Sequence, residues 1–351
     1  MSDESAADDR DGVTVVLGWD ALDHEVTEEF GLSEAFGPHH APLETFDNPV
    51  LGKPHTYELW PSIVTGVTPD EHGIHAATEG EGVDWGNPLI ARASRLAQGV
   101  VPKSVRTKIG QVLRESGAEL DFEYADYYAE RGVSTVFDGR RARSVAIPNH
   151  RVEADDELDL VFDRGAQLGA FLNIQNVDGD HTRHFPKVPL PELEERLVAE
   201  CAKKLGVVRA ALRREHDIVF VWLGYLDTVG HLAPVVAEED PGWQERAYRL
   251  AASMTEEIRD EMQPEDTLVC VSDHGLQDGD HTPHAFVGAS DERAIEGVES
   301  VLDVREGLER VTPKRSPVDE VPVREAFQFG GRVGAKDADE VRGQLEDLGY
   351  L

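Results

Sequence analysis

VTVVLG, at residues 13–18, is the stretch of sequence that decides the fold. It is a short unbroken run of apolar, mostly β-branched residues, which is typical of a parallel strand buried on both faces. Four later runs have the same character: SVAIP (144–148), AFLNI (170–174), DIVFVWLGYL (217–226) and TLVCVS (267–272). Most are separated by stretches that favour helix. This alternation predicts an α/β fold with a mostly parallel central sheet and helices on both faces.

The stretches between the strands predict helices over residues 20–36, 88–116, 191–215 and 243–262. In the third of these, Leu193, Leu197 and Cys201 recur at four-residue spacing, which marks the apolar face of an amphipathic helix. We expect that face to cover the sheet. Residues 103–165 fit the alternation poorly because they are charged and rich in tyrosine, so we interpret them as a small inserted cap.

The ends of the chain differ in character from its middle. Residues 1–12 (MSDESAADDRDG) predict a disordered acidic arm. Residues 13–290 hold all the strand-like runs and form the expected main domain. Residues 291–351 carry few apolar runs before VRGQLEDLGYL, which predicts a short closing helix. We expect this C-terminal segment to pack on the core.

The charge balance excludes several classes of function. The chain has 69 acidic and 34 basic residues in 351, so its net charge is −35. That charge repels nucleic-acid phosphates and anionic membranes, so we expect neither general nucleic-acid binding nor membrane binding. Because the acids are spread along the whole chain, they predict a strongly hydrated surface of the kind found in halophilic proteins. No apolar run approaches the roughly 18 residues that span a bilayer.

Two cysteines, Cys201 and Cys270, are all that the sequence contains. Cys270 lies inside an apolar run, which favours a buried free thiol over a disulfide or a thiolate metal site. The cytoplasm is therefore the expected compartment.

Acidic residues and histidines follow three of the predicted strands. Asp20 follows the first strand, Asp227 and His231 follow DIVFVWLGYL, and Asp273 and His274 follow TLVCVS, with His281 seven residues further on. Taken singly, each fits a helix cap, a turn or a solvated pair. The carboxyl ends of parallel strands, however, converge on one crevice. Carboxylate oxygens and imidazole nitrogens are ligands for Zn²⁺ or Mn²⁺, so the six together predict a site for two divalent ions.

The segment HTYELWPSIVTGVTPDEHGI, residues 55–74, resembles the nucleophile segment of the alkaline phosphatase superfamily. In that superfamily the nucleophile precedes the Thr of a Thr-Gly pair by nine residues, and counting back nine from Thr65 reaches Thr56. In this respect the chain resembles the type I phosphodiesterase and nucleotide pyrophosphatase branch, in which the nucleophile is a Thr. The motifs GWDALD (18–23), LDTVGH (226–231) and SDHG (272–275) then resemble the superfamily's metal motifs in their order.

The resemblance implies a fold like that of alkaline phosphatase over residues 13–290 and a complete set of ligands. One ion would take Asp20, Thr56, Asp273 and His274, and the other would take Asp227, His231 and His281. Zinc is the expected metal, with manganese as the alternative. A hydroxyl coordinated to such an ion has a lowered pKa and becomes a nucleophile, so the implied reaction is hydrolysis of a phosphate ester through a covalent phospho-threonine.

Two assignments stay open at this stage. The motif usually has Pro two residues after the nucleophile, whereas this chain has Glu58 there and Pro61 three residues later, which makes Ser62 a rival hydroxyl. His284 lies three residues beyond His281 and is the alternative last ligand.

The substrate is expected to be a small-molecule phosphate ester, contacted weakly by Asn87 and His181. A phosphomutase or phosphoryl transferase and a sulfatase-like hydrolase are alternatives on the same scaffold. A non-catalytic, metal-dependent binder of phosphorylated ligands is the alternative from another class. The sequence leaves the oligomeric state open.

Overall fold

The computed structural model describes residues 12–78, 82–83, 123–160, 172–178 and 181–328. Within these residues a central sheet has the strand order β2 (His39–Glu44), β12 (His284–Ala289), β9 (Thr267–Val271), β1 (Thr14–Trp19), β8 (Ile218–Leu223) and β5 (Ala142–Val145). Strands β9, β1, β8 and β5 pair in parallel, and β12 runs antiparallel between β9 and β2. The predicted mostly parallel α/β fold is confirmed.

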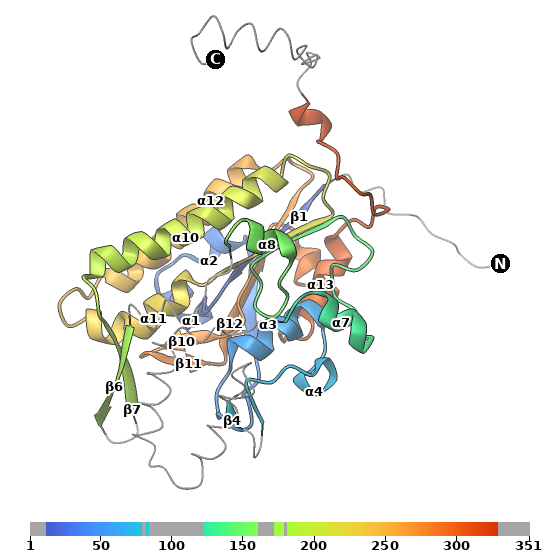
Figure 1. The fold of residues 1–351 in the computed structure, drawn as a ribbon. Coiled ribbons are helices and arrows are strands. Elements are labelled where there is room, and N and C mark those ends of the chain that lie inside the picture. The colour runs from blue at the N-terminus through green and yellow to red at the C-terminus, as the bar shows by residue number, and fades with distance from the viewer. Residues whose placement is uncertain (1–11, 79–81, 84–122, 161–171, 179–180, 329–351) are drawn as a thin grey trace, which may run out of the picture.

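The helices cover both faces of this sheet. They are α1 (His24–Glu29), α2 (Ser33–Phe36), α3 (Thr56–Thr65), α4 (Pro69–His72), α7 (Asp126–Arg131), α8 (Glu153–Glu157), α10 (Leu190–Ala211), α11 (Tyr225–Val236), α12 (Trp243–Glu261) and α13 (Val304–Val311). Helices α10 and α12 lie on one side of the sheet, and α3 and α13 lie on the other (Figure 1).

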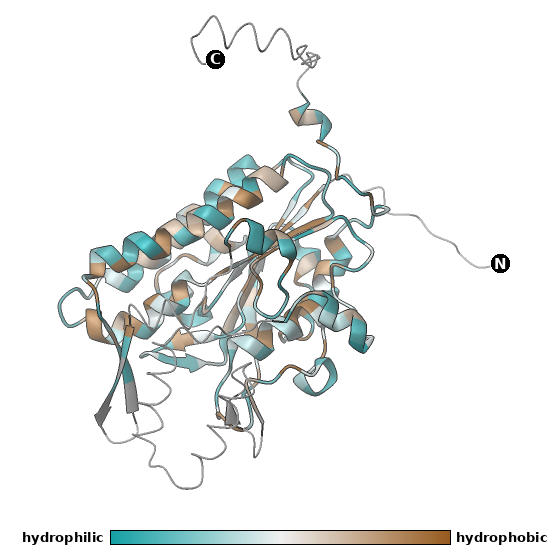
Figure 2. Ribbon diagram, in the orientation of Figure 1, coloured by the Kyte–Doolittle hydropathy of each residue, from teal (hydrophilic) through white to brown (hydrophobic). Residues whose placement is uncertain are grey.

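The alternation of side chains along β8 divides the core in two. Val219, Val221 and Leu223 pack with α10, α11 and α12, whereas Phe220 and Trp222 pack with α3 and α13. Both sides of the strand are buried, which explains why the sequence of β8 is apolar throughout. Figure 2 shows this apolar centre, with hydrophilic residues on the outer sides of the helices.

Two predictions about secondary structure were wrong. AFLNI is not a strand of the central sheet, because β6 (Leu172–Asp178) pairs antiparallel with β7 (His181–Pro186) in a separate hairpin. The single helix expected over residues 20–36 is two short helices. The first begins only after Asp23, whose side chain caps it, and Gly31, with φ of +66°, separates the two.

Some predicted segments lie outside the described residues: the arm up to residue 11, the whole helix over 88–116, and the closing helix in VRGQLEDLGYL. Of the interpreted cap, residues 123–160 are described, and β5 within them is the edge strand of the central sheet. Helix α13, which follows the last strand of the central sheet in the sequence, buries Val304 and Leu308 in the core. Among the described residues no helix is long and apolar enough to cross a bilayer.

Candidate metal centre

The six predicted aspartate and histidine ligands lie at one edge of the sheet, where β1, β8 and β9 end. Asp20 follows β1 directly, and Asp273 and His274 follow β9. Asp227 and His231 lie one turn apart on α11, the helix that begins two residues after β8. A short hairpin of β10 (Gly275–Gln277) and β11 (Asp280–Thr282) adds His281. The parallel topology thus collects residues that are more than 250 positions apart.

The first cluster surrounds the Nε2 atom of His274. Thr56 Oγ1 lies 3.2 Å from this nitrogen and 3.5 Å from Asp20 Oδ1. Asp20 Oδ1 and Asp273 Oδ2 lie 3.4 and 3.5 Å from the same nitrogen. Thr56 is 1 % exposed and the other three residues are fully buried. One hydroxyl, one imidazole and two carboxylates therefore face a common point.

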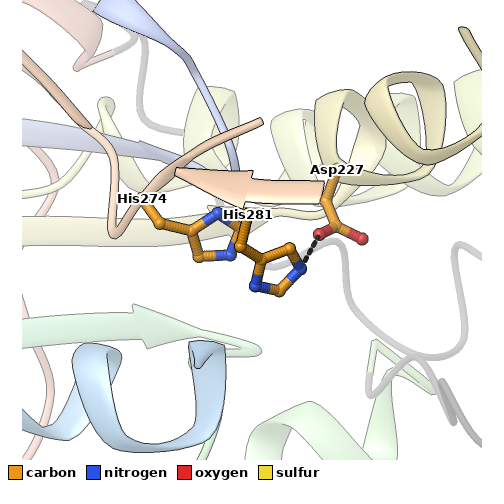
Figure 3. Close-up of side chains that lie close together, drawn as sticks. All are labelled: Asp227, His274 and His281. Atoms are coloured by element: carbon orange, nitrogen blue, oxygen red, sulfur yellow. Dashed lines mark ion pairs between the residues drawn. The ribbon is translucent and has the colours of Figure 1, made fainter. Parts of the chain in front are cut away.

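The second cluster joins Asp227, His231 and His281. The Nε2 atoms of the two histidines are 3.1 Å apart, and they lie 3.5 and 3.7 Å from Asp227 Oδ1. His274 connects the two clusters, because its ring stacks on that of His281 with centroids 4.0 Å apart. Figure 3 shows His274 and His281 side by side, with Asp227 paired to His281. Ligand atoms of these three residues lie within 4.8 Å of one another.

Backbone carbonyls fix the tautomer of all three histidines. The Nδ1 atoms lie close to Gly279 O for His231 (2.8 Å), Pro54 O for His281 (2.8 Å) and Gly275 O for His274 (3.0 Å). A carbonyl oxygen only accepts hydrogen bonds, so each Nδ1 carries the proton and donates it. The Nε2 lone pairs are then directed into the clusters, as in histidines that bind metals.

The spacing within each cluster fits a small divalent ion. Four ligands at about 2.1 Å around a tetrahedral zinc ion are about 3.4 Å from one another. The measured separations run from 3.1 to 3.7 Å in the second cluster and from 3.2 to 3.5 Å in the first. Burial, together with His274 and His231, also lowers the pKa of His281 well below its usual value, so this imidazole is neutral at neutral pH.

Thr56 is the first residue of α3, so its hydroxyl lies at the helix N-terminus. The first turn of the helix is held from outside. Pro61 has no N–H to give to the carbonyl of Tyr57, and Asn149 Nδ2 donates to that carbonyl instead, at 3.0 Å. Asn149 has φ of 55° and is buried. The start of α3 is therefore fixed against the end of β5.

Ser62, the rival hydroxyl, lies away from both clusters and contacts His72. Its Oγ is 3.1 Å from His72 Nε2, and both residues are fully buried. His72 Nδ1 accepts from the backbone N–H of Ile74, at 3.2 Å, so the neutral ring carries its proton on Nε2 and donates it to Ser62. Burial lowers the pKa of His72 to about 4. His72 is thus not placed to take a proton from Ser62.

Glu58 points away from the clusters and connects three segments of the chain. Its carboxylate accepts from the Asn48 side chain and from the backbone N–H of Ala76, at 2.5 and 2.6 Å. Asn48 also caps the turn that follows it, through Val50 and Leu51. Burial raises the pKa of Glu58 against these hydrogen bonds. Glu58, which stands where the motif usually has Pro, therefore joins the loop at Asn48 and the segment at Ala76 to α3.

The remaining predicted residues have varied outcomes. His284, the alternative last ligand, is 43 % exposed at the start of β12 and pairs with Glu25, so the structure brings His281 and not His284 to Asp227. Asn87 and the side chain of His181 lie outside the described residues. His184, on β7, lies beside His231 with ring centroids 4.4 Å apart.

The sequence did not indicate a contact behind Asp20. The indole N–H of Trp222 donates to Asp20 Oδ2 at 3.2 Å, so the two carboxylate oxygens have different partners. Lys204, 1 % exposed, holds its ammonium group 4.2 Å from the centre of the Trp222 ring. A cation over the indole face is attracted to the ring. Trp222 looks like a core residue in the sequence because its apolar strand gives no sign of a polar partner.

The chain is similar to a known protein family and to several solved structures. Residues 52–329 match the model of the family described as type I phosphodiesterase / nucleotide pyrophosphatase. A search of curated proteins returns no match to this sequence. Among solved structures, alkaline phosphatase from the Antarctic bacterium TAB5 is similar at 10 % identity and a TM-score of 0.40, over 87 % of this chain and 99 % of that one. The PH0037 protein from Pyrococcus horikoshii has 11 % identity and a TM-score of 0.40, over 88 % and 100 %.

Proposed function

Because this chain belongs to the type I phosphodiesterase/nucleotide pyrophosphatase family, we propose that it hydrolyses phosphate esters with two metal ions and a covalent phospho-threonine. Family membership makes it a phosphoesterase-type enzyme. The observation that carries the finer proposal is the position of Thr56. Its hydroxyl is the one alcohol in the first cluster, 3.2 Å from His274 and 3.5 Å from Asp20.

The ligands divide into two sets in this proposal. Asp20, Thr56, Asp273 and His274 would hold one ion, and Asp227, His231 and His281 would hold the other. When bound, the ions would supply Lewis acidity, lowering the pKa of the threonine hydroxyl and neutralising charge on the phosphoryl oxygens. Zinc is the first candidate because imidazole and carboxylate ligands at this spacing suit it, and manganese is the second.

The reaction needs two displacements at phosphorus. In the first, Thr56 Oγ1 loses its proton to solvent and forms a bond to phosphorus, while the bond from phosphorus to the leaving alcohol breaks and the alcohol takes up a proton. In the second, water attacks the same phosphorus and the bond to Thr56 breaks, which returns the hydroxyl. Before substrate arrives, Asp20 Oδ1 and His274 Nε2 lie within reach of the Thr56 hydroxyl as acceptors, which orients the attacking oxygen.

The expected substrates are phosphodiesters or nucleotide pyrophosphates of small size. A Thr nucleophile instead of a Cys supports a phosphoesterase over a formylglycine sulfatase. The net charge of −35 opposes long polyanions, which supports small molecules over nucleic acids. The free, buried cysteines Cys201 and Cys270 support a reducing compartment, and we propose the cytoplasm of a halophilic organism.

A substrate panel tests this function directly. Purified protein in molar KCl, reconstituted with zinc or manganese, is given nitrophenyl phosphate, bis-nitrophenyl phosphate, nitrophenyl sulfate and a dinucleotide. We expect the highest kcat/KM for a diester or the dinucleotide. Preference for the sulfate would contradict the proposal. Product transfer to added glycerol in place of water would identify a phosphoryl transferase.

A further inference from the structure

We propose that Asp23 is a positioning residue that sets the second ligand cluster by anchoring the β10–β11 hairpin. Asp23 is fully buried and lies three residues after Asp20, at the N-cap of α1. Its side-chain hydrogen bonds go to the β10–β11 hairpin and to α1. The inference rests on the proposed function, because it requires His281 to be a metal ligand.

The β10–β11 hairpin serves the second cluster in two ways. His281 lies on β11 opposite Leu276, so the register of the hairpin decides where this imidazole points. The turn is Asp278-Gly279, both with positive φ (51° and 83°), which is the favoured two-residue turn for a hairpin. The carbonyl of Gly279 then accepts from His231 Nδ1 at 2.8 Å. A shift of the hairpin would therefore move one ligand and turn a second.

Asp23 holds this hairpin at its open end. Its Oδ2 accepts from the backbone N–H of Leu276 at 2.9 Å and from the hydroxyl of Thr282 at 3.1 Å. The side chain of Gln277 donates to both carboxylate oxygens at 3.2 Å. The other oxygen, Oδ1, accepts from Val26 N at 3.1 Å and so caps α1. One carboxylate thus joins the loop that carries Asp20 to both strands of the hairpin that carries His281.

Gly275 makes this close approach possible. A Cβ atom at position 275 would lie 2.3 Å from Asp23 Oδ2 and 2.5 Å from Thr282 Oγ1. These distances are far inside van der Waals contact, so any side chain there would displace the carboxylate from the hairpin. The glycine between His274 and Leu276 is therefore part of the same anchor.

The test uses Asp23→Asn, which keeps one carbonyl oxygen for the helix cap but replaces the second acceptor with an amide donor. Metal affinity is measured by competition with a chromogenic chelator, and the stability of the metal-free protein by urea unfolding. We expect the weaker of the two bound ions to lose about 10–100-fold in affinity, the range found for residues that orient metal ligands. Asp138→Asn is the matched control: Asp138 accepts from Thr135 N and Oγ1, both at 3.0 Å, in a turn away from the clusters. It should lower stability and leave metal affinity unchanged.

A double-mutant cycle with His281→Ala separates positioning from general loss of structure. If Asp23 acts through the hairpin, Asp23→Asn has a smaller effect on metal binding once His281 is gone, because the hairpin then acts only through the Gly279 carbonyl on His231. An equal loss in both backgrounds would overturn the inference. If Asp23→Asn does not fold, Gly275→Ala and Thr282→Val test the same anchor, and unchanged metal affinity in both would also overturn it. Should His281→Ala alone retain both ions, the proposed ligand set fails instead.

Discussion

The imidazoles of His231 and His281 face each other with their Nε2 atoms 3.1 Å apart. The Nδ1 atom of each ring donates its proton to a backbone carbonyl, so the lone pairs of the two Nε2 atoms face each other. Asp227 Oδ1 lies within 3.7 Å of both Nε2 atoms. With both imidazoles neutral, these three acceptor atoms repel one another. A cation at this point would turn the repulsion into attraction, which supports the proposed metal ion.

We therefore predict two divalent ions per chain after reconstitution and dialysis. His231→Ala should reduce the count to about one, because the second cluster loses one of three ligands and the first is intact. His284→Ala is the control, since His284 pairs with Glu25 at the surface, and it should keep two. Elemental analysis gives the count. No bound metal in the parent protein at neutral pH would contradict the model.

Trp222→Phe should weaken metal binding at the first cluster by about 10–100-fold, because Asp20 loses the indole donor that orients it. Trp60→Phe is a matched change. Trp60 is equally buried, but its indole nitrogen has no hydrogen-bond partner among the described residues. Both variants lose similar packing volume, so both should lose stability. Equal metal affinities in the two variants, measured by chelator competition, would show that the Asp20 contact has no role in binding.

Acid should unfold the metal-free protein through its buried histidines. Burial lowers the pKa of His72, His150 and His216 to about 4. In the unfolded chain these groups have a pKa near 6.5, so below that pH the unfolded state binds more protons and folding stability falls, down to about pH 4. Each histidine contributes a slope of at most about 1.4 kcal/mol per pH unit.

Urea unfolding in molar KCl between pH 7 and pH 5 measures that slope. His150→Phe should reduce the slope by the contribution of one proton, because one titrating imidazole is removed. The variant should still fold, since a Phe ring can replace the imidazole between Tyr128 and Phe137. A slope that is the same in His150→Phe as in the parent would refute the assignment.

The positions of the proposed ligands could be predicted from sequence because they follow a simple rule of topology. Asp20, Asp227 and Asp273 each come soon after an apolar strand, and parallel strands end at one edge of the sheet. The place of Thr56 came from a motif with fixed spacing. These signals are local or follow directly from strand order.

The rest depends on contacts that leave no local trace. Asp20 and Trp222 are 202 residues apart, and nothing in an apolar strand marks one indole as a donor. The antiparallel strand β12 was missed because its register is set by pairing with β2 and β9. AFLNI was misplaced because an apolar run is compatible with a hairpin as well as with a buried strand.

Salt should stabilise the folded protein. A net charge of −35 produces strong self-repulsion at low ionic strength, and the Debye length falls from about 10 Å at 0.1 M to about 3 Å at 1 M. The thermal midpoint at saturating metal should therefore rise markedly between 0.1 M and 2 M KCl. A midpoint that is flat or falls would refute the halophilic interpretation and leave the catalytic proposal standing.

Trapping the covalent intermediate tests the central claim most directly. Metal-loaded protein is mixed with bis-nitrophenyl phosphate, quenched in acid within the first turnover, digested and analysed by mass spectrometry. The account predicts a nitrophenyl-phosphoryl group on Thr56 in the parent and in Ser62→Ala, and no adduct or turnover in Thr56→Ala, which should still bind metal through its remaining ligands. An adduct on Ser62, or turnover that survives Thr56→Ala, would contradict it.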